Sequence, residues 1–565
     1  MNAILTLIIA AVGLGVGYFV YARSINRNII RPDDKRATPA KMYMDGVDFT
    51  PASRNVLFGY QFKSIAALGP IGGPIVAAQW GWLPGLLWII LGTFFIGWVQ
   101  DYASIIVPMR SEGDTFGALS YKLISPRARG ILLVFIYLYL LLIMGAFGQV
   151  IGINFLSKPG VPFGVLSVIL MGLLAGQMTY KWKQDIILTT VITVVVAFFG
   201  IWLGQTSLIS GIFEGLNNAL GAGGKYFWSI VFAIICYLGA VLPIWRWAQP
   251  TNYVSFWIVA LGMVGGVIGM LVWSVKGGAT FGDFPVFTQF TIGIGPLWPI
   301  LPVTIACGAI SGWHSLVSSS GTSRQIEKES DALPVGGGAM WMEMALAIIA
   351  LLTATAATGG WEAYQEAFAA GKFGVFAVGL ATFLSHIGIP TKFGGAYGLV
   401  FLTIMGLTIC YLVVRFMRVA AAELLGDAIP LFKNIHFGAI FALVLSLIVI
   451  WTGVWLTIWV LFGGANQMMA SLALLIITVW LLSKGMKAAW TFWPFVFMYI
   501  TTIAALLYTA FFKALPAALA GEKVVGNIIA FVLALVLVVC AGILGYDGAV
   551  ALSRQRRGEA IPEAE

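Results

Sequence analysis

Long apolar runs separated by short polar loops dominate the chain, and this pattern predicts membrane-spanning helices. About 20 apolar residues in succession cross a bilayer as a helix. The runs lack the regular apolar–polar alternation of strands in a membrane barrel. We therefore predict an all-α polytopic membrane protein with about fifteen transmembrane helices, at 3–22, 62–79, 83–108, 131–155, 161–179, 186–205, 226–244, 254–275, 298–320, 337–357, 393–417, 437–461, 465–483, 489–512 and 525–546.

Composition agrees with this pattern. Of the 565 residues, 60% are hydrophobic and only 10% are charged, whereas a soluble domain carries roughly 25% charged residues. The four cysteines fall inside apolar runs with no metal-ligand spacing, which predicts neither a disulfide framework nor a metal site. No catalytic constellation stands out, so we expect no enzyme activity and no cofactor.

The net charge of +9 comes largely from basic residues in alternate loops. Loop 23–54 is the most basic, and the positive-inside rule places it in the cytoplasm. The N-terminus is then outside a bacterial inner membrane and the C-terminus inside. This alternation requires that residues 373–389, which are interrupted by glycines and followed by Pro390, form a re-entrant or peripheral segment. The same rule accounts for the positive charge without a nucleic-acid partner.

Three regions are predicted along the chain. Residues 1–55 form the first helix and its basic cytoplasmic loop, 56–430 a transporter core with two broken helices, and 431–565 further helices with a short basic tail. No large soluble domain is evident. The absence of a GxxxxGK[ST] motif excludes an ATP-driven motor within this chain, and the absence of an arginine ladder argues against voltage gating.

The first broken segment is 67–74, where two prolines and three glycines in eight residues cannot form a straight helix. Carbonyls freed inside a membrane must find partners in protein, water or an ion. We therefore predict that this segment contributes backbone to a substrate site, through Gly69, Gly72 and Gly73.

The second broken segment, 307–322, concentrates hydroxyls, glycines and one imidazole in an otherwise apolar span. An alternative is that its glycines pack helices and its hydroxyls bond carbonyls of their own helix. The two segments lie seven spans apart and so enter the membrane in opposite directions, as broken helices of inverted repeats do. We predict a substrate site between them, with contributions from Ser311, Gly312, His314, Ser315, Ser319, Ser320 and Thr322.

Ionisable residues within the predicted spans are a second set of candidate functional residues. A carboxylate facing lipid is costly, so Asp101 and Glu343 are expected to face the bundle interior and are candidates for ion or proton coupling, together with His314. The alternative is a structural ion pair near the interface. Because the spans of His314 and Glu343 are consecutive, we expect these two residues near each other. Asn466 and Gln467, at the mouth of a predicted span, are expected either to line a path or to cap a helix.

Several segments resemble the carbon starvation protein A family of bacterial inner-membrane transporters. They are Asp-Gly-Val-Asp-Phe-Thr-Pro at 45–51, Val-Leu-Phe-Gly at 56–59, 64–74, Gln-Asp at 100–101, 306–315, 320–322, Leu-Phe-Gly at 461–463 and Asn-Gln-Met at 466–468. The resemblance implies an inverted-repeat core with broken helices, as in LeuT and the amino-acid/polyamine/organocation superfamily, and transport of peptides or pyruvate. Tyr60 and Gln61 stand where the family commonly has two histidines, and Tyr411 where it has an aspartate.

The leading functional hypothesis is secondary active uptake of a small nutrient, a peptide or pyruvate-like carboxylate, coupled to a proton or Na⁺ and used under carbon starvation. A passive channel or facilitator for small anions is the alternative, and a membrane sensor would need an output domain that is not visible. The expected partners are the substrate, the coupling ion and membrane lipid. The sequence does not determine the oligomeric state.

Overall fold

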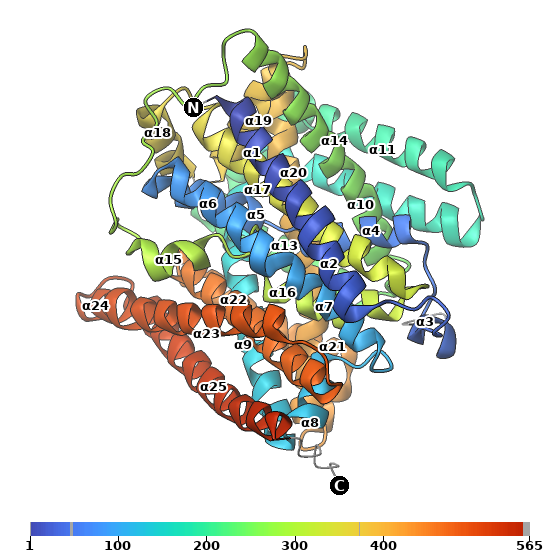
Figure 1. The fold of residues 1–565 in the computed structure, drawn as a ribbon. Coiled ribbons are helices and arrows are strands. Elements are labelled where there is room, and N and C mark those ends of the chain that lie inside the picture. The colour runs from blue at the N-terminus through green and yellow to red at the C-terminus, as the bar shows by residue number, and fades with distance from the viewer. Residues whose placement is uncertain (1, 46–48, 372, 558–565) are drawn as a thin grey trace.

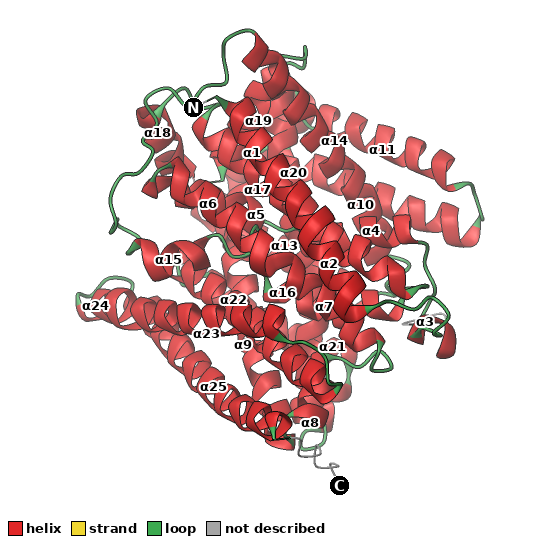
Figure 2. Ribbon diagram, viewed as in Figure 1, coloured by secondary structure: helices red, strands yellow, loops and turns green. Residues whose placement is uncertain are grey.

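The computed structural model describes most of the chain, namely residues 2–45, 49–371 and 373–557. Three residues of the first family segment, Gly46, Val47 and Asp48, lie outside the described residues. Within the described residues every regular element is a helix, and β-structure is limited to isolated bridges (Figure 2). The predicted all-α class is therefore confirmed.

Twelve continuous helical runs in the described ranges are long and apolar enough to cross a membrane. They are α1–η2 (Ala3–Ile30), α6–α7 (Trp82–Met109), α9–η5 (Pro126–Phe155), α10–η6 (Val161–Lys181), α11 (Ile186–Leu203), α12–α13 (Ser207–Val241), α14 (Ala248–Val275), η9–α17 (Glu329–Thr355), α20 (Thr391–Leu425), α22 (Trp455–Ser483), α23–α24 (Ala489–Leu519) and α25 (Val524–Arg556).

Two further predicted spans are broken in the middle. The first consists of α4 (Arg54–Ile65) and α5 (Gly69–Ala77), and the second of α15 (Leu297–Thr304) and α16 (Gly312–Ser320). The shorter apolar helix α21 (Ile435–Ile450) matches one more predicted span. The structure therefore agrees with twelve to fifteen crossings and with both predicted breaks.

The two broken elements run in opposite directions. The amide of Ala52, before α4, donates to the carbonyl of Gln325, after α16, at 3.0 Å. At the other end, the amide of Thr288, before α15, donates to the carbonyl of Trp80, after α5, at 3.0 Å. The start of one element is thus tied to the end of the other, which is the antiparallel arrangement that inverted entry predicts. The halves α5 and α16 lie near the centre of the bundle, whereas α15 lies towards one side of it (Figure 1).

At the centre the two breaks touch. A Cβ atom added to Gly69 would collide with the side chain of Cys307, and one added to Gly73 would lie 2.7 Å from the carbonyl oxygen of Thr304. Only residues without a side chain allow the backbones to approach this closely. The glycines of the first segment therefore hold the two breaks against each other.

The third region departs from its predicted boundaries. The sequence pattern places a span at 437–461 and the next at 465–483, whereas α21 ends at Ile450 and α22 runs without a break through Gly463 and Gly464. The turn lies instead at Gly453, whose φ of +71° is left-handed. The glycine pair inside α22 admits close neighbours, since Gly463 abuts the carbonyl of Val303 in α15. Glycine here marks helix packing and not a helix end.

The segment predicted to be re-entrant or peripheral contains α19 (Gly374–Ser385), a helix of 12 residues. At 1.5 Å per residue it is too short to cross a bilayer alone. It packs against α20 and α17, where Gly398 and Gly379 allow close contact with Ala377 and Thr353. The segment is therefore a short helix held against long ones.

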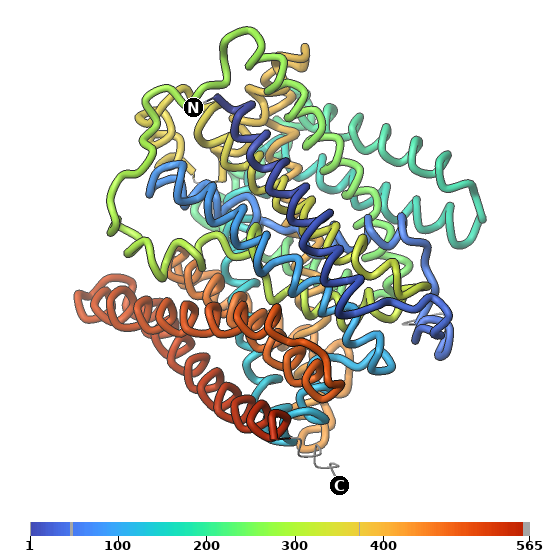
Figure 3. Tube along the Cα trace, in the orientation of Figure 1, coloured from blue at the N-terminus to red at the C-terminus, as the bar shows by residue number. Residues whose placement is uncertain are grey.

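The two termini lie at opposite ends of the bundle (Figure 3). The amide of Ala3 donates to the carbonyl of Ala279 at one end, and Asp547 of α25 pairs with Arg127 at the other. The second end also carries the loop that follows the first helix. Opposite termini agree with an odd number of crossings.

Candidate functional site

The centre of the bundle holds a histidine between two carboxylates. His314, on the first turn of α16, lies with Nδ1 at 2.9 Å from Oδ2 of Asp101 in α7 (Trp98–Met109). Its Nε2 lies 3.1 Å from Oε2 of Glu343 in α17 (Gly338–Thr355), although the angle is not that of a hydrogen bond. None of the three side chains is exposed. We call these residues the carboxylate–histidine cluster.

The composition of this cluster gives it a variable charge. Protons are counted from the state with a neutral imidazole and two ionised carboxyl groups. With one added proton, the imidazolium and the two carboxylates carry a net charge of −1. With a second added proton, the cluster is neutral. An uncompensated charge is costly in a site shielded from water, so burial favours the state with two protons. Contact with water favours release of one. The cluster can therefore bind and release a proton as its access to water changes.

Neutral groups surround the cluster on the α7 side. The hydroxyl of Ser315, next to His314, accepts hydrogen bonds from the amide of Gln100 and, at 3.3 Å, from the hydroxyl of Ser104. Gln100 and Ser104 lie one turn apart on the helix that carries Asp101. Two consecutive residues of α16 are thus tied to α7, one by charge and one by hydroxyl contacts.

Asn466 of α22 bridges the break between α15 and α16. Its Oδ1 accepts from the Ser311 hydroxyl and from the Trp313 amide, both at 3.1 Å, and from the Tyr139 hydroxyl at 2.7 Å. Its Nδ2 donates to Sγ of Cys307 at 3.2 Å. Because the first amides of a helix have no partner within the helix, Asn466 serves as a cap supplied by another helix.

Gln467 serves the other side of the same break. Its Nε2 donates at 2.8 Å to the carbonyl of Pro302, near the end of α15, where no helical amide follows in register. Their sequence positions suggested the mouth of a span. In the structure, both Asn466 and Gln467 are buried in the middle of α22. Of the two expected roles, the contacts show helix capping. Gly312 lies directly against the α22 backbone at Asn466.

One polar side chain of α4 connects it to α16 and to the turn that follows. Gln61 donates to the hydroxyl of Ser318 at 2.9 Å and accepts from that of Thr322. The position that departs from the family pattern therefore connects the two broken elements. Gly72, by contrast, faces the rings of Phe373 and Trp459, so its surroundings are apolar.

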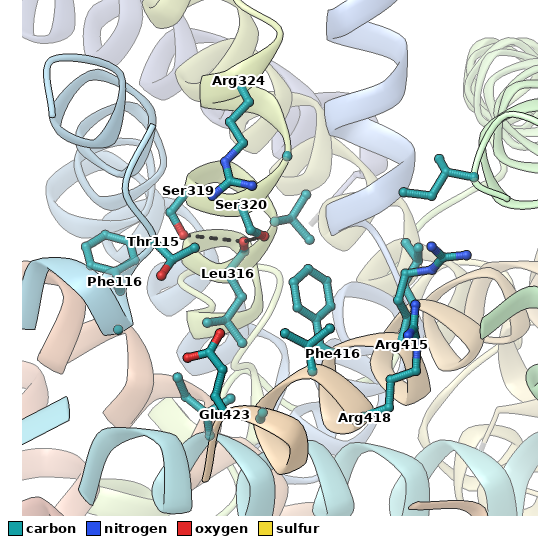
Figure 4. Close-up of a pocket in the computed structure, with 18 of the residues that line it drawn as sticks. Thr115, Phe116, Leu316, Ser319, Ser320, Arg324, Arg415, Phe416, Arg418 and Glu423 are labelled. Atoms are coloured by element: carbon teal, nitrogen blue, oxygen red, sulfur yellow. Dashed lines mark hydrogen bonds between the residues drawn. The ribbon is translucent and has the colours of Figure 1, made fainter. Parts of the chain in front are cut away.

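A cavity of about 420 Å³ opens beside the second half of α16. Figure 4 shows Ser319 and Ser320 at its wall with arginines on two sides. The lining is more basic than acidic, since it includes Arg324, Arg415, Arg418 and one carboxylate, Glu423. We call this cavity the arginine vestibule. Of the predicted substrate residues, Ser319 and Ser320 line it, whereas Ser311, His314 and Ser315 are buried beyond it.

One charged residue of the interior was not predicted. Lys63, in the last turn of α4, is fully buried, and its Nζ donates to the Thr408 hydroxyl of α20 at 2.6 Å. It lies at the edge of the predicted span 62–79, where a lysine is ordinarily at the membrane surface. The signal that could have identified it is its position just before a broken segment, which places it near the middle of the bundle.

The family profile described as "Carbon starvation protein CstA" matches residues 2–367 and 361–505. The "Peptide transporter CstA" of Bacillus subtilis (strain 168) is 29% identical over 84% of this chain and 85% of its own. The "Pyruvate/proton symporter BtsT" of Escherichia coli (strain K12) is 32% identical over 60% of this chain. The match covers about half of that protein, 47% of its length.

Solved structures give a more distant likeness. A crystal structure of MhsT in complex with L-phenylalanine overlaps 87% of this chain and 99% of its own with a TM-score of 0.44 and 14% identity. The Eremococcus coleocola manganese transporter gives the same TM-score and identity over 88% and 95%. The family profile covers well over half of the sequence, in agreement with the motifs that predicted it, and the chain belongs to the carbon starvation protein CstA family.

Proposed function

We propose that the protein is a secondary active transporter that takes up a small carboxylate or peptide together with a proton. The observation that carries this proposal is the fully buried His314 between Asp101 and Glu343, on a broken helix in the middle of the bundle. Ionisable residues in such positions are characteristic of proton pathways in transporters. The names of the relatives, a peptide transporter and a pyruvate/proton symporter, support the same class.

One short helix connects the proton site with the substrate path. α16 has nine residues and carries His314 near its start and Ser319 and Ser320 at its end. A change in the protonation of the cluster alters the forces on this helix, and so does a solute in the arginine vestibule. Both ligands therefore bias the position of one element, which is the physical requirement for coupling. In this proposal residues 56–430 form the core, supported by α22.

The charge of the vestibule favours an anionic substrate. Three arginines and one glutamate line it, and guanidinium groups bind carboxylates with two parallel hydrogen bonds. Pyruvate and the C-terminus of a peptide share this carboxylate. A cation such as a polyamine is disfavoured by the same charges.

The orientation in the membrane is part of the proposal. The C-terminal end of the first helical run (Ala3–Ile30), residues 31–45 and the C-terminal end of α25 lie at one end of the bundle, which the positive-inside rule assigns to the cytoplasm. A periplasmic reporter fused to the C-terminus should be inactive and a cytoplasmic reporter active. The reverse result would invert the assignment of uptake and exit.

Glu343→Gln tests the coupling. Glutamine keeps the shape of the side chain but cannot carry the exchangeable proton. In proteoliposomes we expect the variant to retain counterflow of pyruvate or dialanine at equal pH, and to lose accumulation driven by a proton gradient. Glu362→Gln, at an exposed position of α18 (Trp361–Gly371), is the matched control and should accumulate normally.

Accumulation by Glu343→Gln against a gradient would assign Glu343 a structural role and make Asp101 the next carboxylate to test. A passive channel would equilibrate substrate in the wild-type protein without accumulating it. The same assay therefore separates the two classes of function.

A further inference from the structure

Lys63 is a buried cation in the bundle that lacks an ion-pair partner among the described residues. Its side chain is fully buried, and its one hydrogen bond is to Thr408, at 2.6 Å. The Thr408 hydroxyl in turn donates to the carbonyl of Ile404 at 2.8 Å, so it offers the lysine a neutral acceptor. No ion pair to Lys63 exists within the described residues. An ammonium has three protons to donate, and a buried one without an anion is costly.

Helix geometry places Lys63 directly beyond the arginine vestibule. The vestibule is lined by Tyr60 of α4 and Leu412 of α20. Lys63 follows Tyr60 by three residues, and Thr408 precedes Leu412 by four, so each lies about one turn further inward on the same helix face. The lysine and its partner thus form the next layer between the helices that wall the vestibule.

The third wall shows the same relation. Leu316 of α16 lines the vestibule, and Trp313 lies one turn further inward. The Trp313 indole donates to the carbonyl of Ser64 at 2.7 Å, and its ring contacts that of Phe416, a vestibule residue, edge to face at 5.5 Å. The Ser64 hydroxyl is buried and has no hydrogen-bond partner among the described residues. The inner end of α4 thus holds both an incompletely bonded ammonium and an unsatisfied hydroxyl.

We propose that Lys63 is the residue that binds the substrate carboxylate in the occluded state, below the arginine vestibule. This rests on the proposed uptake of carboxylates and adds the group that selects them. A carboxylate at Nζ supplies the missing negative charge and accepts the remaining protons. The unsatisfied Ser64 hydroxyl and the Trp313 ring lie at the same level of the bundle. In this proposal the arginines attract the substrate into the vestibule, and the lysine binds its carboxylate in the occluded state.

The test compares a carboxylate with its uncharged ester on the full-length protein in detergent. Binding of pyruvate and methyl pyruvate, and of dialanine and its methyl ester, is measured by isothermal titration. The wild-type protein should prefer at least one carboxylate over its ester by roughly 30-fold, as expected for a desolvated charge contact. Lys63→Met should lose that preference, and Lys63→Arg should keep part of it.

Thr408→Val is the matched variant. It removes the hydroxyl partner but leaves the ammonium, so the carboxylate preference should remain within about threefold of wild type, the effect of one neutral hydrogen bond. If Lys63 and Thr408 are only a structural pair, both variants will lose affinity alike, and the proposal is wrong. The elution volume in gel filtration checks that each variant is folded.

Several outcomes separate this proposal from the proposed function. Equal binding of carboxylate and ester by the wild-type protein overturns the lysine assignment even if Lys63→Met does not fold. A normal preference in Lys63→Met does the same while leaving carboxylate transport intact. If carboxylates bind through Lys63 but wild-type proteoliposomes show no proton-driven accumulation, coupling fails and the lysine assignment stands.

Discussion

Two clusters of charged residues in this protein have opposite compositions. In the interior, one imidazole lies between two carboxylates, and all three side chains are fully buried. At the end of the bundle that carries loop 23–54, one carboxylate lies between two guanidinium groups: Glu329 contacts Arg36 at 2.9 Å and Arg110 at 2.8 Å. The Glu329 side chain is only 1% exposed, whereas that of Arg36 is 51% exposed. We call the second group the arginine–glutamate lock.

The difference between the groups lies in which members can change charge. Arginine does not release its proton in proteins, so the lock keeps both of its cations, and these favour the ionised form of Glu329. Histidine and two carboxylates can exchange protons. The backbone contacts agree, since the Asp33 amide donates to Glu329 at 2.9 Å and fixes the loop after the first helix to the start of the η9–α17 run. We therefore expect a permanent lock, and the proposed function requires an adjustable cluster.

A neighbouring carboxyl strengthens the lock. The amide and hydroxyl of Ser330 donate to Asp34 at 2.9 and 2.8 Å. The backbone hydrogen bond is the main cause that lowers the pKa of Asp34 below its ordinary value. A carboxyl with a lowered pKa stabilises the folded state above its unfolded pKa, and this contribution is lost only as the pH falls through the lower value. This contact between the loop and the start of the η9–α17 run therefore persists at neutral pH.

The largest effect is expected for His314→Gln. The substitution removes the cation and leaves two buried carboxylates near each other, so both must be protonated or the site must open. We expect proton-driven uptake in proteoliposomes to fall at least about 100-fold, in the range of several kcal/mol for an unpaired buried charge. His386→Asn is the control, because His386 stacks on Trp273 and bonds only groups of its own helix.

Retention of uptake by His314→Gln within tenfold of wild type would contradict the adjustable role of the cluster. A profile of uptake against external pH adds a second criterion. The pH dependence of the wild-type protein should be altered in this variant and unchanged in His386→Asn.

An intermediate effect is expected for Glu329→Gln, which breaks the lock. Each hydrogen bond to a charged group is worth roughly 2 kcal/mol, so thermal unfolding of the purified protein should occur several degrees lower. Uptake per folded molecule should fall less than about fivefold, and its pH dependence should stay the same, because the carboxylate–histidine cluster is unchanged. Glu327→Gln is the control, since its pair with Lys41, at 3.5 Å, is about 40% exposed on both sides.

A changed pH profile in Glu329→Gln would show that the lock takes part in proton transfer, and the division between permanent and adjustable groups would be wrong. An unchanged unfolding temperature would show that solvent already screens the lock. The pH profile tests whether the lock exchanges protons, and the unfolding temperature tests whether it stabilises the fold.

The sequence predicted the parts of this arrangement that depend on local pattern. Apolar runs predicted the spans. A cluster of proline and glycine predicted the first break, because these residues disfavour a helix in any environment, and a concentration of glycines, hydroxyls and one imidazole predicted the second. Charge also predicted that Asp101, His314 and Glu343 face inward, since lipid excludes them. The expected proximity of His314 and Glu343 followed from consecutive spans, and the two side chains lie 3.1 Å apart.

What could not be predicted depends on long-range packing. Gly463 and Gly464 resemble a helix end in the sequence, and only the approach of Val303 in α15 and of Leu506 in α23 shows that they are packing contacts. Asn466 caps a helix more than 150 residues away in the sequence, at Trp313. Lys63 could not be distinguished from a surface lysine until the depth of the break was known. These are tertiary properties, and local propensity carries no information about them.

The smallest effect is expected for Ser315→Ala, which leaves the charges of the cluster and removes one of its neutral supports. The Ser315 hydroxyl accepts from Gln100 and Ser104, so its loss leaves donors on α7 without a partner, at a cost of about 1 kcal/mol. Proton-driven uptake should fall about two- to fourfold, because the ion contacts of His314 still position α16. Ser446→Ala, whose buried hydroxyl bonds only the Ala442 carbonyl of its own helix, should be close to wild type. If Ser315→Ala is instead as damaging as His314→Gln, the hydroxyl itself must contact the transported species, since no lost structural hydrogen bond accounts for a 100-fold effect. The adjustable site would then extend from the cluster to the hydroxyls of α16.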